Sequence, residues 1–361
     1  MLKGTFATEA IAILDNVFTD MEAETHEEKV MTDMISHEIR LVSRPNGMVT
    51  ADNFALVQTE LKPLQDRLVL VRNLYMSVDP YMRGRMDDRE SYVPPFEVGK
   101  PLEGAAVGEV IESYAEEFKP GDIVTSNFGW REAFIAAPKA LHRVNPEIQP
   151  LSVYLGALGA TGLTAWVGLN LVEVKAGDVV FISGAAGAVG SVAGQLAKLR
   201  GCRVIGSAGS TEKVRFLQQC GFDIAIDYKV RPILEQLKQE VPDGIDVYFD
   251  NVGGETLEAA LSMLRVHGRI IACGGISSYN EPQPGPSNLF NVTTKRLTMK
   301  GLIVSDWLDR RDEFEQEVGG YFRDGKLKNH ETVVVGIDRA VSAFIGLFEG
   351  KNIGKMVVKL N

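Results

Sequence analysis

A glycine-rich segment in the middle of the chain has the composition of a phosphate-binding turn. It reads Gly184-Ala185-Ala186-Gly187-Ala188-Val189-Gly190, after a predicted strand at Val179–Ser183 and before a predicted helix at 188–200. A dinucleotide pyrophosphate needs glycine where the backbone approaches it closely, and the partial positive charge of a helix N-terminus stabilises it. The alternative is an ordinary tight turn, but a second predicted strand at Arg203–Ser207 favours the nucleotide site. We therefore expect the stretch Gly187-Ala188-Val189-Gly190 to contact a dinucleotide.

The end of the second predicted strand lacks the acidic residue typical of NAD sites. The chain reads Ser207-Ala208-Gly209-Ser210-Thr211-Glu212-Lys213 there, whereas an Asp or Glu at the strand end would bind the adenosine 2′-OH. Without that carboxylate a 2′-phosphate is not repelled, and Gly209, Ser210 and Lys213 offer backbone, hydroxyl and ammonium donors. Ser210 also fits the N-cap of the next helix, and a capping residue is well placed to meet an anion. The stretch favours NADP over NAD.

Two further glycine-containing loops follow predicted strands of the same region. Asp250-Asn251-Val252-Gly253-Gly254 ends one strand, and Cys273-Gly274-Gly275-Ile276-Ser277 ends the next. In an open parallel sheet, ligands bind outside the carboxyl ends of the strands. Asn251 is therefore a candidate cofactor contact, and an ordinary turn residue is the alternative.

Strand and helix patterns divide the body of the chain into three segments. Residues 34–150 contain short β-type runs separated by Gly and Pro, which predict a mostly β domain. Residues 151–320 alternate β-branched runs with helical spacing, which predicts an α/β domain with a doubly wound parallel sheet. Residues 321–361 return to short strands and one helix, so we expect them to complete the β domain.

Residues 1–33 form an acidic extension to these segments. Their acidity contradicts the basic start of a secretory signal and the composition of an Arg-rich transit peptide. The spacing of Ile11, Leu14, Val17 and Phe18 allows one short amphipathic helix. A loosely ordered tail is the alternative.

Composition excludes several classes of partner and compartment. The net charge of −10 disfavours nucleic acid and anionic membrane surfaces, and no run of 18 apolar residues predicts a membrane span. The three cysteines, Cys202, Cys220 and Cys273, form no metal-binding or disulfide pattern. We expect a cytoplasmic protein with a small-molecule ligand.

Beyond the glycine loop, the chain resembles the zinc-free branch of the medium-chain dehydrogenase/reductase superfamily. That branch contains the leukotriene B4 12-hydroxydehydrogenase/prostaglandin reductases and the bacterial curcumin reductases, and the resemblance is closest to the curcumin reductase group. It covers about residues 37–361. The motifs that carry it are Ser77-Val78-Asp79-Pro80-Tyr81-Met82-Arg83-Gly84-Arg85-Met86, Ser91-Tyr92-Val93-Pro94-Pro95, Gly187-Ala188-Val189-Gly190, Phe249-Asp250-Asn251-Val252-Gly253-Gly254, Ser277-Ser278-Tyr279-Asn280 and Gly350-Lys351-Asn352-Ile353-Gly354-Lys355.

The resemblance implies a GroES-like catalytic domain, an inserted Rossmann domain and a homodimer joined through the Rossmann domains. It also implies that NADPH reduces the C=C bond of α,β-unsaturated carbonyl compounds. By the family pattern, Lys213 and Ser210 face the 2′-phosphate, Tyr228 lies near it, and Asn251 and Asn352 lie beside the cofactor. One departure is Ala185, which occupies the position of the first glycine of a strict GxGxxG.

Zinc-dependent members of the superfamily take catalytic ligands from two regions that differ here. These regions read Tyr75–Asp79 and Leu102-Glu103-Gly104, without Cys or His. The scattered cysteines also cannot build a structural Cys₄ site. We therefore expect no metal and no alcohol oxidation of the zinc-dependent type.

Enone reduction without a metal requires a donor for the enolate oxygen and a proton for the α-carbon. A tyrosine phenol, with a reference pKa of about 10, keeps its proton at neutral pH. Tyr81, Tyr92 and Tyr279 are the candidates, with Tyr92 as the acid and Tyr279 as a positioning group that also contacts the cofactor. Packing with a satisfied hydroxyl is the alternative for each.

Two other functions compete with enone reduction. A quinone reductase of the same superfamily would use the same NADPH site with another acceptor, and a cofactor-binding protein without turnover belongs to a different class. The motifs around Tyr81 and Tyr279 favour the enone reductase. The physiological substrate depends on the loop Asn280–Asn291, whose path the sequence leaves open.

Overall fold

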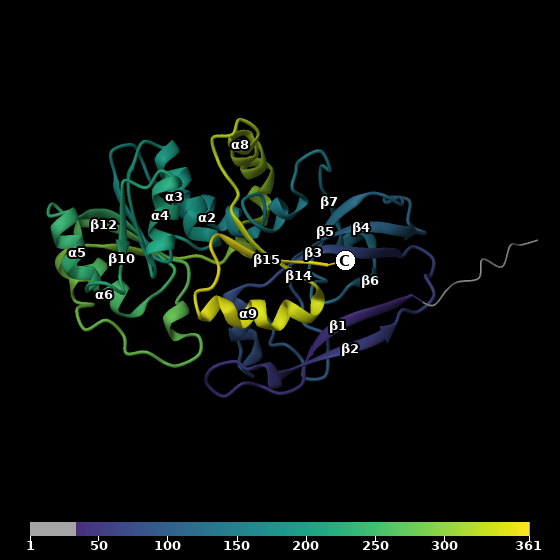
Figure 1. The fold of residues 1–361 in the computed structure, drawn as a ribbon. Helices are drawn as coiled ribbons and strands as arrows, with labels where there is room; N and C mark the ends of the chain where they lie inside the picture. Colours follow the sequence, from purple (N-terminus) through teal and green to yellow (C-terminus); the bar gives the residue numbers. More distant parts are fainter. Residues whose placement is uncertain (1–33, 361) are drawn as a thin grey trace, which may run out of the picture. The chain divides into compact units, whose positions relative to one another are not determined.

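The computed structural model describes residues 34–360, so the extension at 1–33 and its predicted helix or tail lie outside the described residues. The described chain contains one parallel sheet with helices and one largely antiparallel β region (Figure 1). This arrangement confirms the predicted fold class. No helix among the described residues is both long and apolar enough to cross a membrane.

The parallel sheet has six strands in the order β10-β9-β8-β11-β12-β13. The order reverses between β8 and β11, which is the switch point at which doubly wound sheets bind dinucleotides. The strand bounds are β8 (Val179–Ile182), β9 (Arg203–Ala208), β10 (Ile224–Asp227), β11 (Ile245–Asp250), β12 (Leu264–Ala272) and β13 (Thr298–Gly301).

Helices cover both faces of this sheet because its strands are apolar on both sides. Along β8, Val180 and Ile182 join one core with α2, α3, α4 and α8, whereas Val179 and Phe181 join the other core with α5 and α6. The helix bounds are α2 (Ala160–Leu171), α3 (Ala188–Leu199), α4 (Thr211–Gln219), α5 (Ile233–Glu240), α6 (Gly254–Met263), α7 (Asn291–Thr294) and α8 (Arg311–Arg323).

The β region is built from both ends of the described chain. Its seven-stranded sheet runs β14-β15-β3-β4-β5-β7, and β6 pairs with β3. β15 pairs antiparallel with β3, placing Val357 opposite Ser77. The bounds are β1 (Ile35–Leu41), β2 (Phe54–Glu60), β3 (Val69–Ser77), β4 (Ala106–Ser113), β5 (Ile123–Ser126), β6 (Ala133–Ala136), β7 (His142–Arg143), β14 (Glu331–Val335) and β15 (Lys355–Lys359).

A helix and a 3₁₀ segment close the core of the β region. α9 (Ala340–Phe348) lies beside the β1–β2 hairpin in Figure 1, and its Phe344 packs edge-on against Trp130 with ring centroids 5.9 Å apart. The 3₁₀ segment η2 (Pro80–Met86) buries Met82 and Met86 in the same core. The remaining 3₁₀ segments are η1 (Ala51–Asn53), η3 (Pro138–Ala140), η4 (Leu151–Leu155), η5 (Ile276–Ser278), η6 (Val304–Arg310) and η7 (Ile337–Arg339).

The boundary expected at residue 320 falls inside helix α8. α8 runs through residue 320, and its Phe314 and Val318 pack in the core of the parallel-sheet domain. Leu327 belongs to the same core. The core of the parallel-sheet domain therefore includes residues on both sides of the expected boundary.

Candidate active site

The glycine loop joins β8 to the N-terminus of α3, with Gly187 as the N-cap residue. A Cβ atom on Gly190 would lie 2.6 Å from the carbonyl oxygen of Gly184, and one on Gly187 would lie 3.2 Å from the same oxygen. Gly184 itself has a φ of +55°, a conformation that favours glycine. The first backbone N–H groups of α3 have no intrahelical acceptor, so the turn and the helix end can hold a pyrophosphate.

The end of β9 brings together the residues expected to meet a 2′-phosphate. Ser210 is the N-cap of α4, and its Oγ accepts a hydrogen bond from the Lys213 N–H at 3.3 Å. The Tyr228 hydroxyl occupies the space beside Gly209, where a Cβ would lie only 2.5 Å from it. Burial lowers the pKa of Lys213, and the nearby ammonium of Lys229 lowers it further. Lys213 and Lys229 are both cationic, and β9 does not end in an acidic residue. This arrangement favours a dianionic ligand.

The segment that carries Asn352 reaches the glycine loop from the β region. Gly354 forms a parallel bridge with Gly187, and its N–H donates to the Ala186 carbonyl at 2.7 Å. The Asn352 side chain donates to the Gly354 carbonyl at 2.8 Å, which fixes this turn. Residues separated by nearly half of the chain therefore lie side by side at the glycine loop, where they could form one cofactor cradle.

Asn251 follows β11 at the switch point and is tied to the strand beside it. Its side-chain amide donates to the Ser183 carbonyl at 2.8 Å, and its backbone N–H donates to the Ser183 hydroxyl at 3.0 Å. Behind it, Asp250 Oδ1 accepts the Tyr248 hydroxyl at 2.7 Å and the Gly253 N–H at 2.8 Å. These bonds position Asn251 at the carboxyl ends of the strands, where a turn role and a cofactor contact are compatible.

The three candidate tyrosines converge from two parts of the chain. Tyr81 lies in η2, Tyr92 in the loop after it, and Tyr279 follows η5 beyond β12. Burial raises the pKa of Tyr92, and the Tyr279 phenol raises it further, whereas Arg85 lowers it. Burial likewise raises the pKa of Tyr81, with smaller contributions from Asp79 and Tyr92.

Exposure distinguishes the three phenols. Tyr92 is 58% exposed and Tyr81 is 37% exposed, so substrate can reach both, although burial of the Tyr81 phenol raises its pKa well above 10. The Tyr279 hydroxyl accepts the Gly275 N–H at 3.3 Å, and burial also raises its pKa. All three phenols therefore keep their protons at neutral pH and remain hydrogen-bond donors.

A hollow of about 410 Å³ lies at the carboxyl ends of β12 and β13. Its lining includes Cys273, Gly274, Leu302 and Asp306. Cys273 contributes to the raised pKa values of Tyr92 and Tyr279, and burial raises its own pKa to about 12. One lining residue, Cys273, thus lies near Tyr92 and Tyr279, and the hollow lies on the half of the sheet beyond the switch point.

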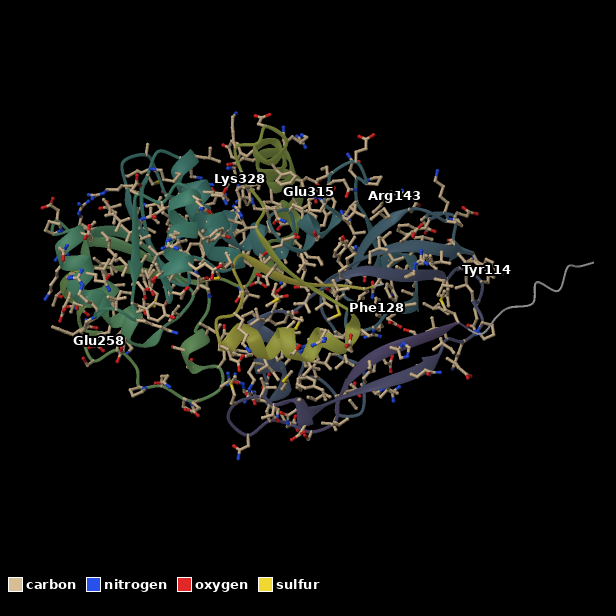
Figure 2. The ribbon with its side chains drawn as sticks, in the orientation of Figure 1. Tyr114, Phe128, Arg143, Glu258, Glu315 and Lys328 are labelled. Carbon is tan, nitrogen blue, oxygen red and sulfur yellow. The ribbon has the colours of Figure 1, made fainter. Side chains whose placement is uncertain are left out.

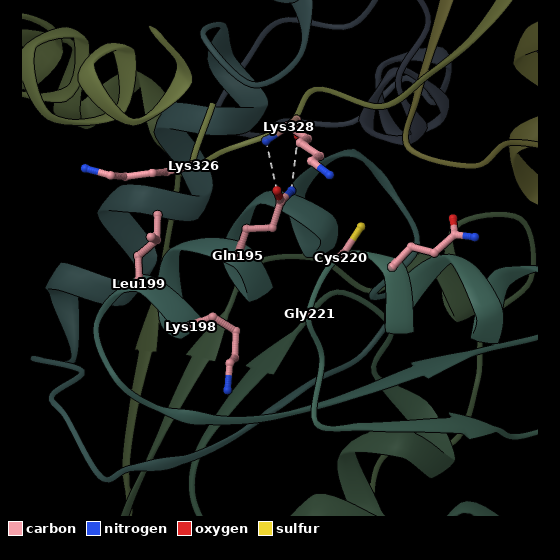
Figure 3. A pocket seen from close by; sticks show the side chains of 8 residues that line it. Gln195, Lys198, Leu199, Cys220, Gly221, Lys326 and Lys328 are labelled. Atoms are coloured by element: carbon pink, nitrogen blue, oxygen red, sulfur yellow. Dashed lines mark hydrogen bonds between the residues drawn. The ribbon is translucent and has the colours of Figure 1, made fainter. Parts of the chain in front are cut away.

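A second hollow, of about 270 Å³, is unrelated to these residues (Figure 3). It lies at the carboxyl end of α3, opposite the glycine loop, where the Gln195 side chain bonds the Lys328 backbone at 2.9 and 3.1 Å. Lys198 and Lys326 point apart in Figure 3 and pair with Asp223 and Asp324. The ammonium groups of Lys198 and Lys326 thus do not converge on one point in the hollow. We therefore leave this hollow out of the candidate site.

The loop whose path the sequence left open is anchored on α6. Glu258 accepts the Ser287 N–H at 3.0 Å and the Ser287 hydroxyl at 2.7 Å, and its carbonyl accepts the Asn288 amide at 2.8 Å. Figure 2 labels Glu258 at this helix. Beyond the anchor, Leu289 and Phe290 are 55% and 74% exposed.

Sequence reasoning missed four charged residues around the site. Lys229 lies beside Lys213, and Arg85 lies near Tyr81 and Tyr92, where it pairs with Glu103 at 2.8 Å. Lys355 and Asp79 form a buried pair at 2.9 Å. Asp79, Arg85 and Lys355 lie within the quoted motifs and Lys229 directly follows Tyr228, which is the signal that could have identified them. Among the described residues, no group of three His, Cys, Asp or Glu side chains is placed to hold a metal ion.

A doubly wound sheet with a glycine loop at its switch point, facing tyrosines from a β domain, defines a two-domain, dinucleotide-dependent oxidoreductase. Family models described as "N-terminal domain of oxidoreductase" and "Zinc-binding dehydrogenase" match residues 37–144 and 188–319. The NADPH-dependent curcumin reductase of Escherichia coli is 39% identical over 89% of this chain and 95% of its own length. The NADP(+)-dependent 2-alkenal reductase of Nicotiana tabacum is 45% identical over 81% of this chain and 87% of its own.

One solved structure is similar to this chain in both sequence and fold. The crystal structure of CurA from Vibrio vulnificus in complex with NADPH has a TM-score of 0.86 and 40% identity, covering 90% of this chain and 99% of that protein. The chain belongs to the medium-chain dehydrogenase/reductase family. The resemblance inferred from the motifs is thereby confirmed.

Proposed function

We propose that this NADP(H)-dependent oxidoreductase reduces the carbon–carbon double bond of α,β-unsaturated ketones and aldehydes. The observation that carries the proposal is that Tyr92 lies near both Tyr81 and Tyr279, and that Tyr92 and Tyr279 also lie near Cys273, which lines the hollow at the ends of β12 and β13. Relatives named as curcumin reductase and 2-alkenal reductase support the substrate class.

The cofactor cradle holds NADPH with groups from both parts of the chain. Gly187, Ala188, Val189 and Gly190 hold the pyrophosphate at the N-terminus of α3. The residues assigned to the 2′-phosphate and to the remaining cofactor contacts are Gly209, Ser210, Lys213, Tyr228, Asn251, Tyr279 and Asn352. When bound, NADPH supplies a hydride to the β-carbon of the substrate.

The tyrosines complete the reduction. As the β-carbon gains the hydride, negative charge develops on the carbonyl oxygen, and a phenol O–H stabilises it by donating a hydrogen bond. Tyr92 supplies the proton that the α-carbon needs, and Tyr279 orients the carbonyl against the cofactor. Proton donation by a positioned acid contributes about 10²–10⁴-fold to rate. The raised pKa of each phenol keeps that proton available.

The decisive experiment measures NADPH consumption with alkenals, enones, curcumin and quinones, and it identifies the products. NADPH deuterated at nicotinamide C4 should place deuterium on the β-carbon of the saturated ketone. Turnover of quinones alone would favour the quinone reductase. NADPH binding without turnover of any acceptor would favour a protein that binds the cofactor for another purpose.

The proposal includes a homodimer in a reducing, cytosolic compartment. β13 is the edge strand of the parallel sheet, all four of its residues are exposed, and Met299 is 41% exposed. An uncovered edge strand is a template for pairing, and a two-fold axis would continue the sheet into a second copy. Cys202, Cys220 and Cys273 are free thiols, which suits the cytosol. Light scattering should give the dimer mass for the wild type and a monomer for Met299→Lys.

A further inference from the structure

Lys355, at the start of β15, is a lysine removed from solvent. Its side chain is 2% exposed, and its ammonium donates to three oxygens: the Val78 carbonyl at 3.0 Å, the Met356 carbonyl at 3.0 Å and Asp79 Oδ1 at 2.9 Å. Lysine is almost never fully buried unless it is paired. Replacing such a pair by apolar residues is often neutral or stabilising, so stability alone does not account for its presence.

The backbone of Lys355 is held directly against the cofactor cradle. The preceding residue, Gly354, donates its N–H to the Ala186 carbonyl in the glycine loop at 2.7 Å. Gly354 has a φ of +67°, and a Cβ there would lie 2.1 Å from the His330 carbonyl oxygen. The same His330 oxygen accepts the Lys355 N–H at 2.8 Å. Gly354 and Lys355 are therefore in direct backbone contact with the glycine loop and with His330.

Asp79, the other member of the pair, begins the segment that carries Tyr81. Its carbonyl accepts the Met82 N–H at 3.1 Å, which forms the first turn of η2. Its carboxylate also accepts the Ser77 hydroxyl, so the side chain is fixed on both oxygens. Tyr81 is the second residue of η2, and its phenol is close enough to Asp79 for the carboxylate to raise its pKa.

We propose that Lys355 and Asp79 are positioning residues that couple occupancy of the glycine loop to the placement of Tyr81. The connection runs from the Ala186 carbonyl through Gly354 and Lys355 to Asp79, and from there along the first turn of η2. NADPH on the glycine loop fixes Gly354, and the buried pair then fixes the first turn of η2 beneath the tyrosine. The proposal rests on the proposed reductase function, because it concerns where Tyr81 lies when the cofactor is bound.

The test compares wild-type enzyme with the double variant Lys355→Met/Asp79→Asn, which leaves no unpaired buried charge. 3-Fluorotyrosine at position 81 reports the surroundings of Tyr81 by ¹⁹F NMR, with and without NADPH. NADPH should shift the wild-type resonance, and the double variant should lose at least half of that shift. Its kcat should fall by up to about 10²-fold, since a 1 Å misplacement can cost that much. Its Kd for NADPH, measured by fluorescence, should change less than threefold, which is small beside the tenfold change that 1.4 kcal/mol represents.

The matched control is Lys198→Met/Asp223→Asn, which removes a lysine–aspartate pair at 2.8 Å near the other end of α3. It should retain the wild-type shift and kcat. A double variant at 355 and 79 that also retains both would overturn the coupling. If that variant does not fold, Lys355→Met alone supplies the test, because it removes the donor to Asp79 and leaves no buried ammonium. Wild-type shift and kcat in Lys355→Met would then reject the proposal.

The two proposals fail in different ways. The ¹⁹F response to NADPH needs no substrate, so it tests the coupling even if no enone is reduced. Absence of enone turnover in the wild type would refute the reductase function. An unaltered ¹⁹F response in the double variant would refute the coupling while leaving the reductase function intact.

Discussion

The Nε atom of Arg83 donates a hydrogen bond to Oδ1 of Asn280 at 3.1 Å. Arg83 lies two residues after Tyr81 in η2, and Asn280 directly follows Tyr279, so one bond joins the two segments that carry candidate tyrosines. Arg83 is 3% exposed, and its guanidinium is further fixed by Asp87 at 2.7 Å. The bond thus ties the segment that carries Tyr81 to the segment that carries Tyr279.

Removing this bond should impair catalysis more than cofactor binding. Asn280→Ala deletes the acceptor, and we expect kcat to fall about tenfold, because small displacements of positioned groups cost rate. The Kd for NADPH should stay within a factor of about two, well under the tenfold that 1.4 kcal/mol represents. Asn280→Asp retains an acceptor oxygen and is the matched control. A kcat equal to wild type in Asn280→Ala would contradict the positioning role.

If Tyr92 is the acid, its replacement should lower kcat more than Asn280→Ala does. Tyr92→Phe keeps the ring and removes the hydroxyl, so kcat for a conjugated enone should fall about 10²-fold, with little change in NADPH binding. The control is Tyr114→Phe, since Tyr114 is a comparably exposed tyrosine at the edge of the β region, labelled in Figure 2. An unchanged kcat in Tyr92→Phe would remove Tyr92 from the acid role.

Local patterns predicted the elements that have strong periodicity. β8 (Val179–Ile182), β9 (Arg203–Ala208) and α3 (Ala188–Leu199) begin at the expected residues, and each differs from the prediction by one residue at its end. α2 was not predicted because it is apolar on nearly all sides, with Trp166 and Leu169 both buried. β13 was not predicted either, because its four residues are all exposed and show no apolar alternation.

The site was predictable only in its separate parts. The residue types of Tyr92 and Tyr279 indicated their chemistry, but no local pattern can place side chains from distant segments beside one another. The same holds for Asp79 and Lys355, whose pairing depends on the antiparallel register of β3 and β15. The anchor of the Asn280–Asn291 loop was not predicted either. In the sequence Glu258 has the pattern of an ordinary exposed helix residue, and only the structure shows that Ser287 donates a hydrogen bond to it.

The 2′-phosphate assignment predicts a change in cofactor preference. Lys213→Ala combined with Ser210→Ala should weaken NADPH by about 10²-fold, since a hydrogen bond to a charged group contributes about 1.5–3 kcal/mol. NADH lacks the phosphate, so its Kd should change little. Because Ser210 caps α4, its loss also costs about 1 kcal/mol of stability, and Lys213→Ala alone controls for that effect. Equal decreases in affinity for NADPH and NADH would contradict the assignment of Lys213 and Ser210 to the 2′-phosphate.

The pH dependence of kcat follows from the direction of the Tyr92 pKa shift. Tyr92 acts in its protonated form, and burial together with Tyr279 raises its pKa above 10.0. The acid is therefore fully present below pH 10.0 and is lost only as the pH rises through the higher, folded-state pKa. We expect kcat to stay level on the alkaline side up to about pH 10 and to decline above it.

The free energy of unfolding should decrease over the same alkaline pH range in which kcat declines. A phenol whose pKa is raised on folding binds its proton more tightly in the native state, so the free energy of unfolding falls as the pH rises above 10.0. Melting temperatures at each pH separate this loss from the catalytic one. In Tyr92→Phe the alkaline decline of the residual kcat should disappear wherever the protein is still folded. A decline that persists unchanged in Tyr92→Phe would show that another group titrates, and Tyr279, whose pKa burial also raises above 10.0, would be the next to replace.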